Sequence, residues 1–159
     1  MCGIVGYVGP NVDGRALEVV MEGLARLEYR GYDSAGVALV VGPSVSITKR
    51  AGKLVNLTDA LDLDPLPGSS TAIGHTRWAT HGGPTDANAH PHRGGADGKL
   101  ALIHNGISQN FHPLKSGPTS DGVQVVNDTQ TEAGRPRPTR PSQGTGRHTP
   151  ALGSAGGAR

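Results

Sequence analysis

The chain has 159 residues, enough for one domain, and is 35% hydrophobic and only 3% aromatic, with 25 glycines. Its net charge of +2 hides an uneven distribution: residues 1–132 carry ten Lys and Arg against 13 Asp and Glu, whereas residues 133–159 carry five arginines and no acidic residue. Because the excess positive charge lies in residues 133–159, it does not indicate a nucleic-acid-binding surface on the domain. A single cysteine excludes an internal disulfide, and no apolar run approaches the ~20 residues that cross a bilayer. Without a secretory signal, we expect a cytoplasmic protein that binds neither membrane nor nucleic acid.

The first 31 residues predict a strand followed by a helix. Residues 3–8, GIVGYV, form a short apolar run rich in β-branched side chains, typical of a buried strand. Asn11 is expected to cap the helix, and Gly31 to end it in a left-handed conformation. The apolar stripe of this helix repeats at three- and four-residue spacing, through Leu17, Val20, Met21, Leu24 and Leu27.

The following segment predicts a mixture of hairpin, helix and strands. Residues 35–41 and 44–50 flank the turn residues Gly42 and Pro43, which favours a β-hairpin. Residues 53–61 predict a short helix. Further strands are expected at residues 71–77, 99–104 and 123–126, with a Gly/Pro/His-rich loop between the first two. This order predicts an α+β fold with substantial antiparallel pairing.

The predicted domain ends near residue 132. Residues 129–132, TQTE, have the pattern of a capping box, which should open a helix. Four prolines follow before residue 151, and each would cost a helix interior about 3 kcal/mol. Residues 133–159 are therefore expected to be disordered. Their Arg/Pro/Gly-rich composition is typical of out-of-frame translation of GC-rich DNA, so we expect a frameshift or a truncated fragment.

The one cysteine, Cys2, directly follows Met1. A thiol packed as a small hydrophobic side chain is one interpretation of it. If Met1 is removed, however, Cys2 carries both a thiol and a free α-amino group, whose pKa of ~7.7–8.0 leaves part of it basic at physiological pH. Such an amino group can act as the general base for the side chain of its own residue.

Three other stretches supply the remaining groups of an acyl-transfer site. They are RLEYRGYDSAG at 26–36, GHTRWATHGGP at 74–84 followed by NAHPH at 88–92, and HNG at 104–106. Asn105 and Gly106 follow a predicted strand, and an amide side chain with a glycine N–H can hold the oxyanion of a tetrahedral intermediate. Arg77 offers a planar fork suited to a carboxylate, with Thr80 and His81 as nearby donors.

Together with MCGIVGYVG and HNGI, these stretches resemble the glutaminase domain of the glucosamine-6-phosphate synthase (glutamine–fructose-6-phosphate aminotransferase) family. The resemblance covers residues 1–132 and places them among the class II glutamine amidotransferases. It implies the N-terminal-nucleophile (Ntn) hydrolase fold, an αββα four-layer sandwich, incomplete here at its C-terminus. It also implies hydrolysis of L-glutamine through a Cys2 thioester, which supplies ammonia for glucosamine 6-phosphate synthesis.

The resemblance implies a role for each matched residue near the reacting bond. Cys2 would attack the side-chain amide of glutamine, and Asn105 and Gly106 would form the oxyanion hole. Arg30 would help to order the terminal cysteine.

The same resemblance implies how glutamine is held. Arg77, with Thr80 and His81, would bind its α-carboxylate, and Trp78 would lie in a mobile loop that closes over it. Gln130 stands where the family has an aspartate that binds the substrate amino group. Because a neutral amide supplies no charge, glutamine is expected to bind more weakly here.

The resemblance further implies that the sugar-isomerase domains, which bind fructose 6-phosphate, are absent from this sequence. The family uses no cofactor, and its full-length members are expected to be homo-oligomers. Two alternatives remain open: an inactive truncated remnant, and a metal-binding domain. The second rests on five histidines, His75, His81, His90, His92 and His104, although no cysteine or acidic cluster accompanies them.

Overall fold

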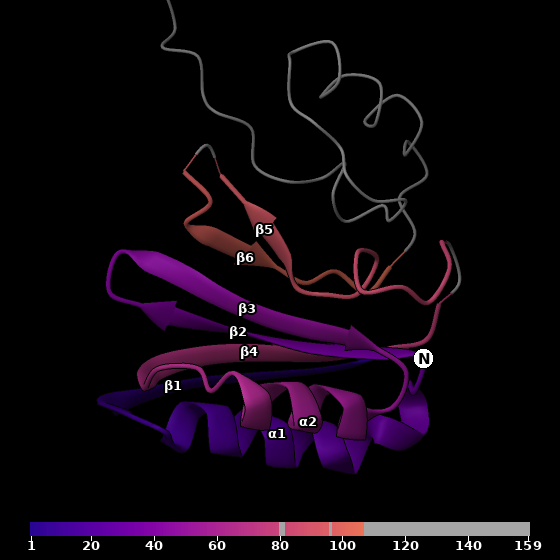
Figure 1. Cartoon of the computed structure of the whole chain (residues 1–159), viewed down its shortest axis with the longest axis horizontal. Coiled ribbons are helices and arrows are strands. Elements are labelled where there is room, and N and C mark those ends of the chain that lie inside the picture. The colour runs from indigo at the N-terminus through magenta and orange to yellow at the C-terminus, as the bar shows by residue number, and fades with distance from the viewer. Residues whose placement is uncertain (80–81, 96, 107–159) are drawn as a thin grey trace, which may run out of the picture.

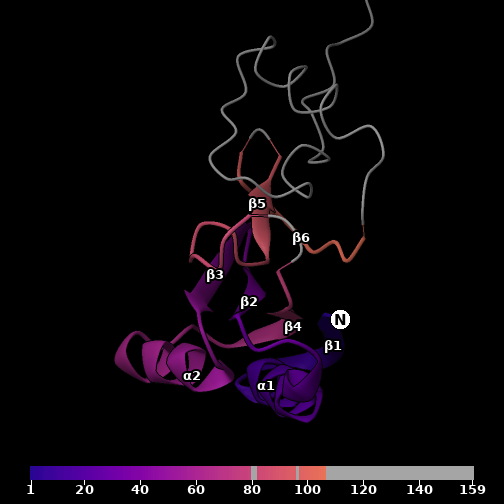
Figure 2. The same ribbon diagram turned by 90° about the vertical axis from the view of Figure 1, so that its right-hand side faces the viewer.

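The computed structural model describes residues 1–79, 82–95 and 97–106. Their elements are β1 (Gly3–Asp13), α1 (Arg15–Leu27), the short 3-10 helix η1 (Glu28–Arg30), β2 (Ser34–Val41), β3 (Ser44–Ala51), α2 (Leu54–Leu63), β4 (Ser69–Arg77), β5 (His92–Gly94) and β6 (Leu100–Leu102). Four strands form an antiparallel sheet in the order β1-β4-β2-β3, and β5 pairs with β6. Both helices cover one face of the larger sheet, while β5 and β6 lie over the other (Figures 1 and 2).

The hydrophobic core lies between the larger sheet and the two helices. Its buried side chains are Ala16, Val20 and Leu24 of α1, Leu54, Leu57 and Leu61 of α2, and Ala35, Val37, Leu39 and Ala72 of the sheet. Gly74 lets α1 approach β4 closely, because a Cβ atom there would lie 2.5 Å from a Val20 methyl group. The apolar stripe predicted from the sequence thus packs against the sheet.

Some apolar side chains of the sheet face away from the helices. Because successive side chains of a strand alternate between its faces, Ile4 and Val8 lie opposite to Val5, which packs against the core. Ile4 is 49% exposed and Val8 is 80% exposed. Within the described residues, this face of β1 is therefore apolar and open.

The predicted α+β class is confirmed, as are several of its elements. The hairpin expected at residues 35–41 and 44–50 is β2 and β3, and Gly42 takes a φ of +57° in the turn between them. The helix expected at 53–61 is α2, and the strand expected at 71–77 is β4.

The predicted start and end of α1 are wrong. Asn11 does not cap this helix, because β1 continues to Asp13 and the Asp13 Oδ1 accepts a hydrogen bond from the Arg15 N–H at 2.9 Å. Gly31 is extended, with a φ of −164°, and follows η1 rather than ending α1. Its lack of a side chain has another reason: a Cβ atom there would lie 2.7 Å from the carbonyl carbon of Arg77.

The second half of the chain also differs from expectation. The strand expected at 99–104 is shorter, Leu100–Leu102, and it pairs with β5, a strand that was not predicted. The strand expected at 123–126 and the tail at 133–159 lie outside the described residues. No helix in the described part of the chain is long and apolar enough to span a membrane.

Candidate active site

Cys2 lies beside the residue that follows β4. β1 and β4 are antiparallel, with Gly3 opposite Thr76, so the beginning of β1 adjoins the end of β4. The Trp78 N–H donates to the Cys2 Sγ at 3.4 Å, and the thiol donates to the Trp78 carbonyl oxygen at 3.8 Å. The Cys2 side chain is half-buried, whereas Met1 is 78% exposed. Strand pairing therefore brings two residues 76 positions apart into contact.

Asp33 holds the chain on both sides of Trp78. Its backbone N–H donates to the Arg77 carbonyl oxygen at 3.2 Å, and its Oδ2 accepts a hydrogen bond from the Ala79 N–H. Its own carbonyl oxygen accepts a hydrogen bond from the Gly52 N–H at 2.7 Å. Asp33 lies in one of the stretches that carry the family resemblance, but sequence reasoning gave it no role.

Arg77, the last residue of β4, is buried and held by the chain that follows it. Its exposed fraction is 5%, and its guanidinium donates to the carbonyl oxygens of Gly83 at 3.3 Å and Gly82 at 3.4 Å. Gly82 takes a φ of +73°, a left-handed conformation that favours glycine. The Asn88 Nδ2 donates to the same Gly83 oxygen at 3.1 Å. These contacts fix the plane of the guanidinium, and the role of Arg77 in binding a substrate carboxylate stays a prediction.

Aromatic side chains flank the same end of the sheet. The Tyr32 and Trp78 rings meet edge to face with their centroids 5.2 Å apart, and Trp78 is 44% exposed. Arg30 donates to the Tyr29 hydroxyl oxygen at 2.8 Å, and its guanidinium lies 5.3 Å from the centroid of the Tyr29 ring. Its hydrogen bond within the described residues thus goes to Tyr29, and its role toward Cys2 stays a prediction.

Of the other predicted site residues, the structure describes only two. Asn105 and Gly106 are exposed and follow β6. In both views, the described chain ends, in orange, on the same side of the molecule as the N-terminus (Figures 1 and 2). Their role as an oxyanion hole stays a prediction. Thr80, His81 and Gln130 lie outside the described residues.

Three histidine rings contact one another in the interior, next to Arg77. The ring centroids of His75 and His90 are 4.5 Å apart, and those of His90 and His92 are 4.6 Å apart, both pairs edge to face. All three residues are buried. Among the described residues, no group of three His, Cys, Asp or Glu side chains could hold a metal ion. The structure therefore gives the metal-binding alternative no support in this part of the chain.

His75 and His90 are held in their neutral form. Burial lowers the pKa of His75 to about 4, and the Arg77 guanidinium adds to this shift. Burial also lowers the pKa of His90 to about 2, with further contributions from His75, His92, Arg77 and Lys49. Inside the protein, a charged imidazolium would lose its hydration next to other cations.

Comparison with curated proteins decides the family. The chain is 60% identical over 132 residues to glutamine–fructose-6-phosphate aminotransferase (isomerizing) of Streptomyces coelicolor, which covers 83% of this chain and 21% of that protein. For the enzymes so named from Corynebacterium diphtheriae and Mycobacterium tuberculosis the identities are 59% and 54%, over 83% of this chain and 22% and 21% of theirs. This chain belongs to the glutamine–fructose-6-phosphate aminotransferase family. It spans about a fifth of the length of these curated relatives.

Two solved structures match the fold of this chain. The glutamine phosphoribosylpyrophosphate amidotransferase of B. subtilis, complexed with ADP and GMP, matches with a TM-score of 0.68 and 27% identity, over 84% of this chain and 28% of that one. A structure described as the allosteric regulatory enzyme of purine biosynthesis matches with a TM-score of 0.69, at the same identity and coverage. No family model matches the chain. The expected Ntn amidotransferase fold is thus confirmed at the level of its α+β architecture.

Proposed function

We propose that residues 1–132 of this family member form a glutaminase domain that hydrolyses L-glutamine, with Cys2 as the nucleophile. The observation that carries this proposal is the contact between the Cys2 Sγ and the Trp78 N–H at 3.4 Å, next to the buried Arg77. A nucleophile and a cation for the substrate carboxylate thus lie at adjoining strand ends. Identity of 60% to an aminotransferase named for glutamine supports the same reaction.

The chemistry requires that Met1 be removed, and its exposure of 78% is compatible with this. The freed α-amino group of Cys2 takes the thiol proton while the sulfur attacks the carboxamide carbon of glutamine. The tetrahedral intermediate then collapses, its C–N bond breaks, and the amino group returns the proton to the leaving nitrogen as ammonia. Water hydrolyses the resulting thioester, which releases glutamate and restores the thiol.

Substrate binding and oxyanion stabilisation follow from the residues around this sulfur. We assign the α-carboxylate of glutamine to Arg77, assisted by Thr80 and His81, because a fixed guanidinium plane favours a two-point bond to a carboxylate. Trp78 would close over the substrate, and Asn105 with Gly106 would hold the oxyanion. Arg30 would order the amino terminus. At Gln130, the substrate ammonium would meet a neutral amide.

The αββα arrangement is also part of this proposal. α1 and α2 cover one face of the larger sheet, and the open apolar side chains Ile4 and Val8 line its other face. An apolar sheet face of this kind is suited to packing against a second sheet. The acceptor of the ammonia would be the fructose 6-phosphate for which the longer relatives are named.

Replacement of the nucleophile tests the proposed reaction. We expect the purified chain to release glutamate from glutamine and Cys2→Ala to lower kcat on the order of 10³-fold or more, because loss of a nucleophile removes the covalent route. Intact mass shows whether Met1 has been removed, and far-UV circular dichroism shows whether both proteins are folded.

The possible outcomes separate the alternatives. Equal activity of Cys2→Ala would exclude Cys2 as the nucleophile. Activity in a sample that retains Met1 would exclude the α-amino group as the base. Two folded but inactive proteins would show that the chain is an inactive remnant.

A further inference from the structure

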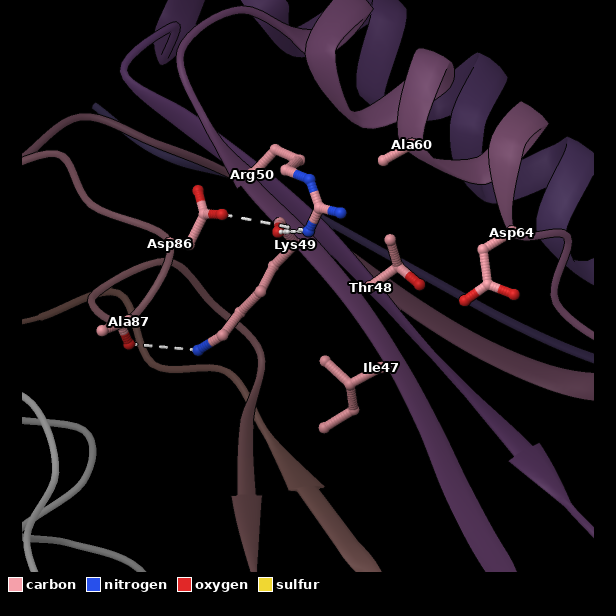
Figure 3. A pocket seen from close by; sticks show the side chains of 8 residues that line it. All are labelled: Ile47, Thr48, Lys49, Arg50, Ala60, Asp64, Asp86 and Ala87. Atoms are coloured by element: carbon pink, nitrogen blue, oxygen red, sulfur yellow. Dashed lines mark hydrogen bonds and ion pairs between the residues drawn. The ribbon is translucent and has the colours of Figure 1, made fainter.

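Lys49 ties the edge strand β3 to the segment that follows Arg77. β3 is the last strand of the larger sheet, and Lys49 pairs with Gly36 on the neighbouring strand. The Lys49 ammonium donates to the Ala87 carbonyl oxygen at 3.1 Å and to the Ala89 carbonyl oxygen at 2.8 Å. Figure 3 shows the side chain reaching from β3 across to Ala87. Both bonds are charge-assisted and hence stronger than those of a neutral donor.

The two carbonyl groups bound by Lys49 flank Asn88, which contacts the site itself. Asn88 is buried, with an exposed fraction of 5%. Its Nδ2 donates at 3.1 Å to the Gly83 oxygen, and the Arg77 guanidinium donates to this same oxygen at 3.3 Å. A continuous series of contacts therefore leads from the Lys49 ammonium through Asn88 and Gly83 to Arg77.

A second contact anchors the same segment to β3. The Ala51 N–H donates to Asp86 Oδ1 at 2.6 Å, and the Arg50 guanidinium lies 3.9 Å from Asp86 Oδ2. A pocket of about 410 Å³ lies beside these residues, lined by β3, by α2 and by Asp86 and Ala87 (Figure 3). Beside this pocket, polar contacts of Lys49, Arg50 and Ala51 join the segment to β3.

We infer that Lys49 is a positioning residue that sets the orientation of Arg77 and thereby the affinity for the α-carboxylate of the substrate. The inference rests on the proposed function, which assigns that carboxylate to Arg77. Lys49 acts through Asn88 and Gly83. Its loss should therefore weaken binding and leave the chemical step at Cys2 unchanged.

The test compares Lys49→Met with Lys49→Arg in the full chain. We expect Lys49→Met to raise the KM for glutamine about tenfold, equivalent to ~1.4 kcal/mol, and to leave kcat within about twofold. Lys49→Arg should restore most of the affinity, because a guanidinium can also donate to two carbonyl oxygens. Lys53→Met is the matched control, since Lys53 is exposed at the start of α2 and should leave KM unchanged. An unchanged KM in Lys49→Met would overturn the inference. A tenfold fall in kcat in place of the rise in KM would overturn it as well.

Binding of glutamate separates this inference from the proposed reaction, because it presents the same α-carboxylate and needs no turnover. We expect the Kd for glutamate, measured by calorimetry, to rise about tenfold in Lys49→Met and to recover in Lys49→Arg. If the parent chain fails to hydrolyse glutamine but shows this pattern, the proposed reaction is wrong and the inference holds. A Kd that is the same in all variants would overturn the inference.

A second variant covers the case in which Lys49→Met does not fold. Asn88→Asp has nearly the same shape but replaces the Nδ2 donor by an acceptor, which repels the Gly83 oxygen. We expect the same rise in the glutamate Kd. An unaltered Kd in this folded variant would also count against the series of contacts from Lys49 to Arg77.

Discussion

Asp33 forms hydrogen bonds with both ends of the tripeptide 77–79, which has Trp78 at its centre. Its N–H donates to the Arg77 oxygen at 3.2 Å, and its carboxylate accepts a hydrogen bond from the Ala79 N–H. The Trp78 N–H between them donates to the Cys2 sulfur at 3.4 Å. Asp33 therefore helps to set the position of the sulfur relative to β4 through the backbone of residues 77–79.

Replacement of Asp33 should measure this contribution. We expect Asp33→Ala to lower the free energy of unfolding by about 2 kcal/mol, because hydrogen bonds to a charged group contribute ~1.5–3 kcal/mol. Asp33→Asn keeps an acceptor oxygen and should lose about half as much. Urea unfolding measures both values, with Asp62→Ala, at an exposed position of α2, as the control. Equal stabilities of Asp33→Ala and Asp62→Ala would contradict the anchoring role.

Among the elements, the segment at 82–92 rests directly on β2, where Gly36 makes room for it. A Cβ atom at Gly36 would collide with the His90 carbonyl oxygen and would lie 2.6 Å from the Lys49 Cβ. Gly36 also pairs with His75 on β4, so the close approach of His90 to β2 lies next to the cluster of three histidine rings. The contact between the segment and the sheet thus requires a missing side chain on one strand.

Gly36→Ala should therefore displace the segment. We expect a loss of about 1–3 kcal/mol in the free energy of unfolding, as for overpacked interiors, together with weaker glutamate binding. Gly14→Ala is the matched control, since a Cβ atom there would meet nothing within 4 Å. Thermal unfolding and calorimetry give the two quantities. A Gly36→Ala protein as stable as Gly14→Ala would show that the approach of His90 to β2 is not tight.

For the whole molecule, the buried histidines couple stability to pH. Their folded-state pKa values, about 4 for His75 and about 2 for His90, lie below the ordinary value of 6.5. As the pH falls below 6.5, the unfolded chain therefore binds protons that the folded protein does not. Stability is fully present above this pH, and His75 lowers it progressively until the pH reaches about 4.

Unfolding at several pH values tests this coupling. We expect the free energy of unfolding to fall by about 2 kcal/mol between pH 7.5 and pH 5 from His75 alone, since one pKa unit corresponds to 1.36 kcal/mol. His75→Leu should reduce the slope of the unfolding free energy against pH by close to one proton. The same slope in His75→Leu and the parent would contradict the prediction.

The sequence by itself determined the features that depend on local pattern. Apolar side chains at helical spacing predicted α1 and α2, and alternation and turn residues predicted the β2–β3 hairpin. The family was predicted from several stretches together: the one around Cys2, those at 26–36, 74–84 and 88–92, and the one that begins at His104. Such features need no knowledge of distant contacts, because the period of a helix or strand and the residues of a family motif can be read along the chain.

Only the tertiary structure decided how these parts meet. Lys49 and Ala89 are 40 positions apart, and Cys2 and Trp78 are 76 apart, so no local pattern could pair them. Gly31 was predicted to be a helix cap because the close approach of Arg77 cannot be seen from its neighbours in the sequence. The physical reason is the same in each case: strand pairing and loop packing bring together groups whose roles arise from contacts made only after the chain has folded.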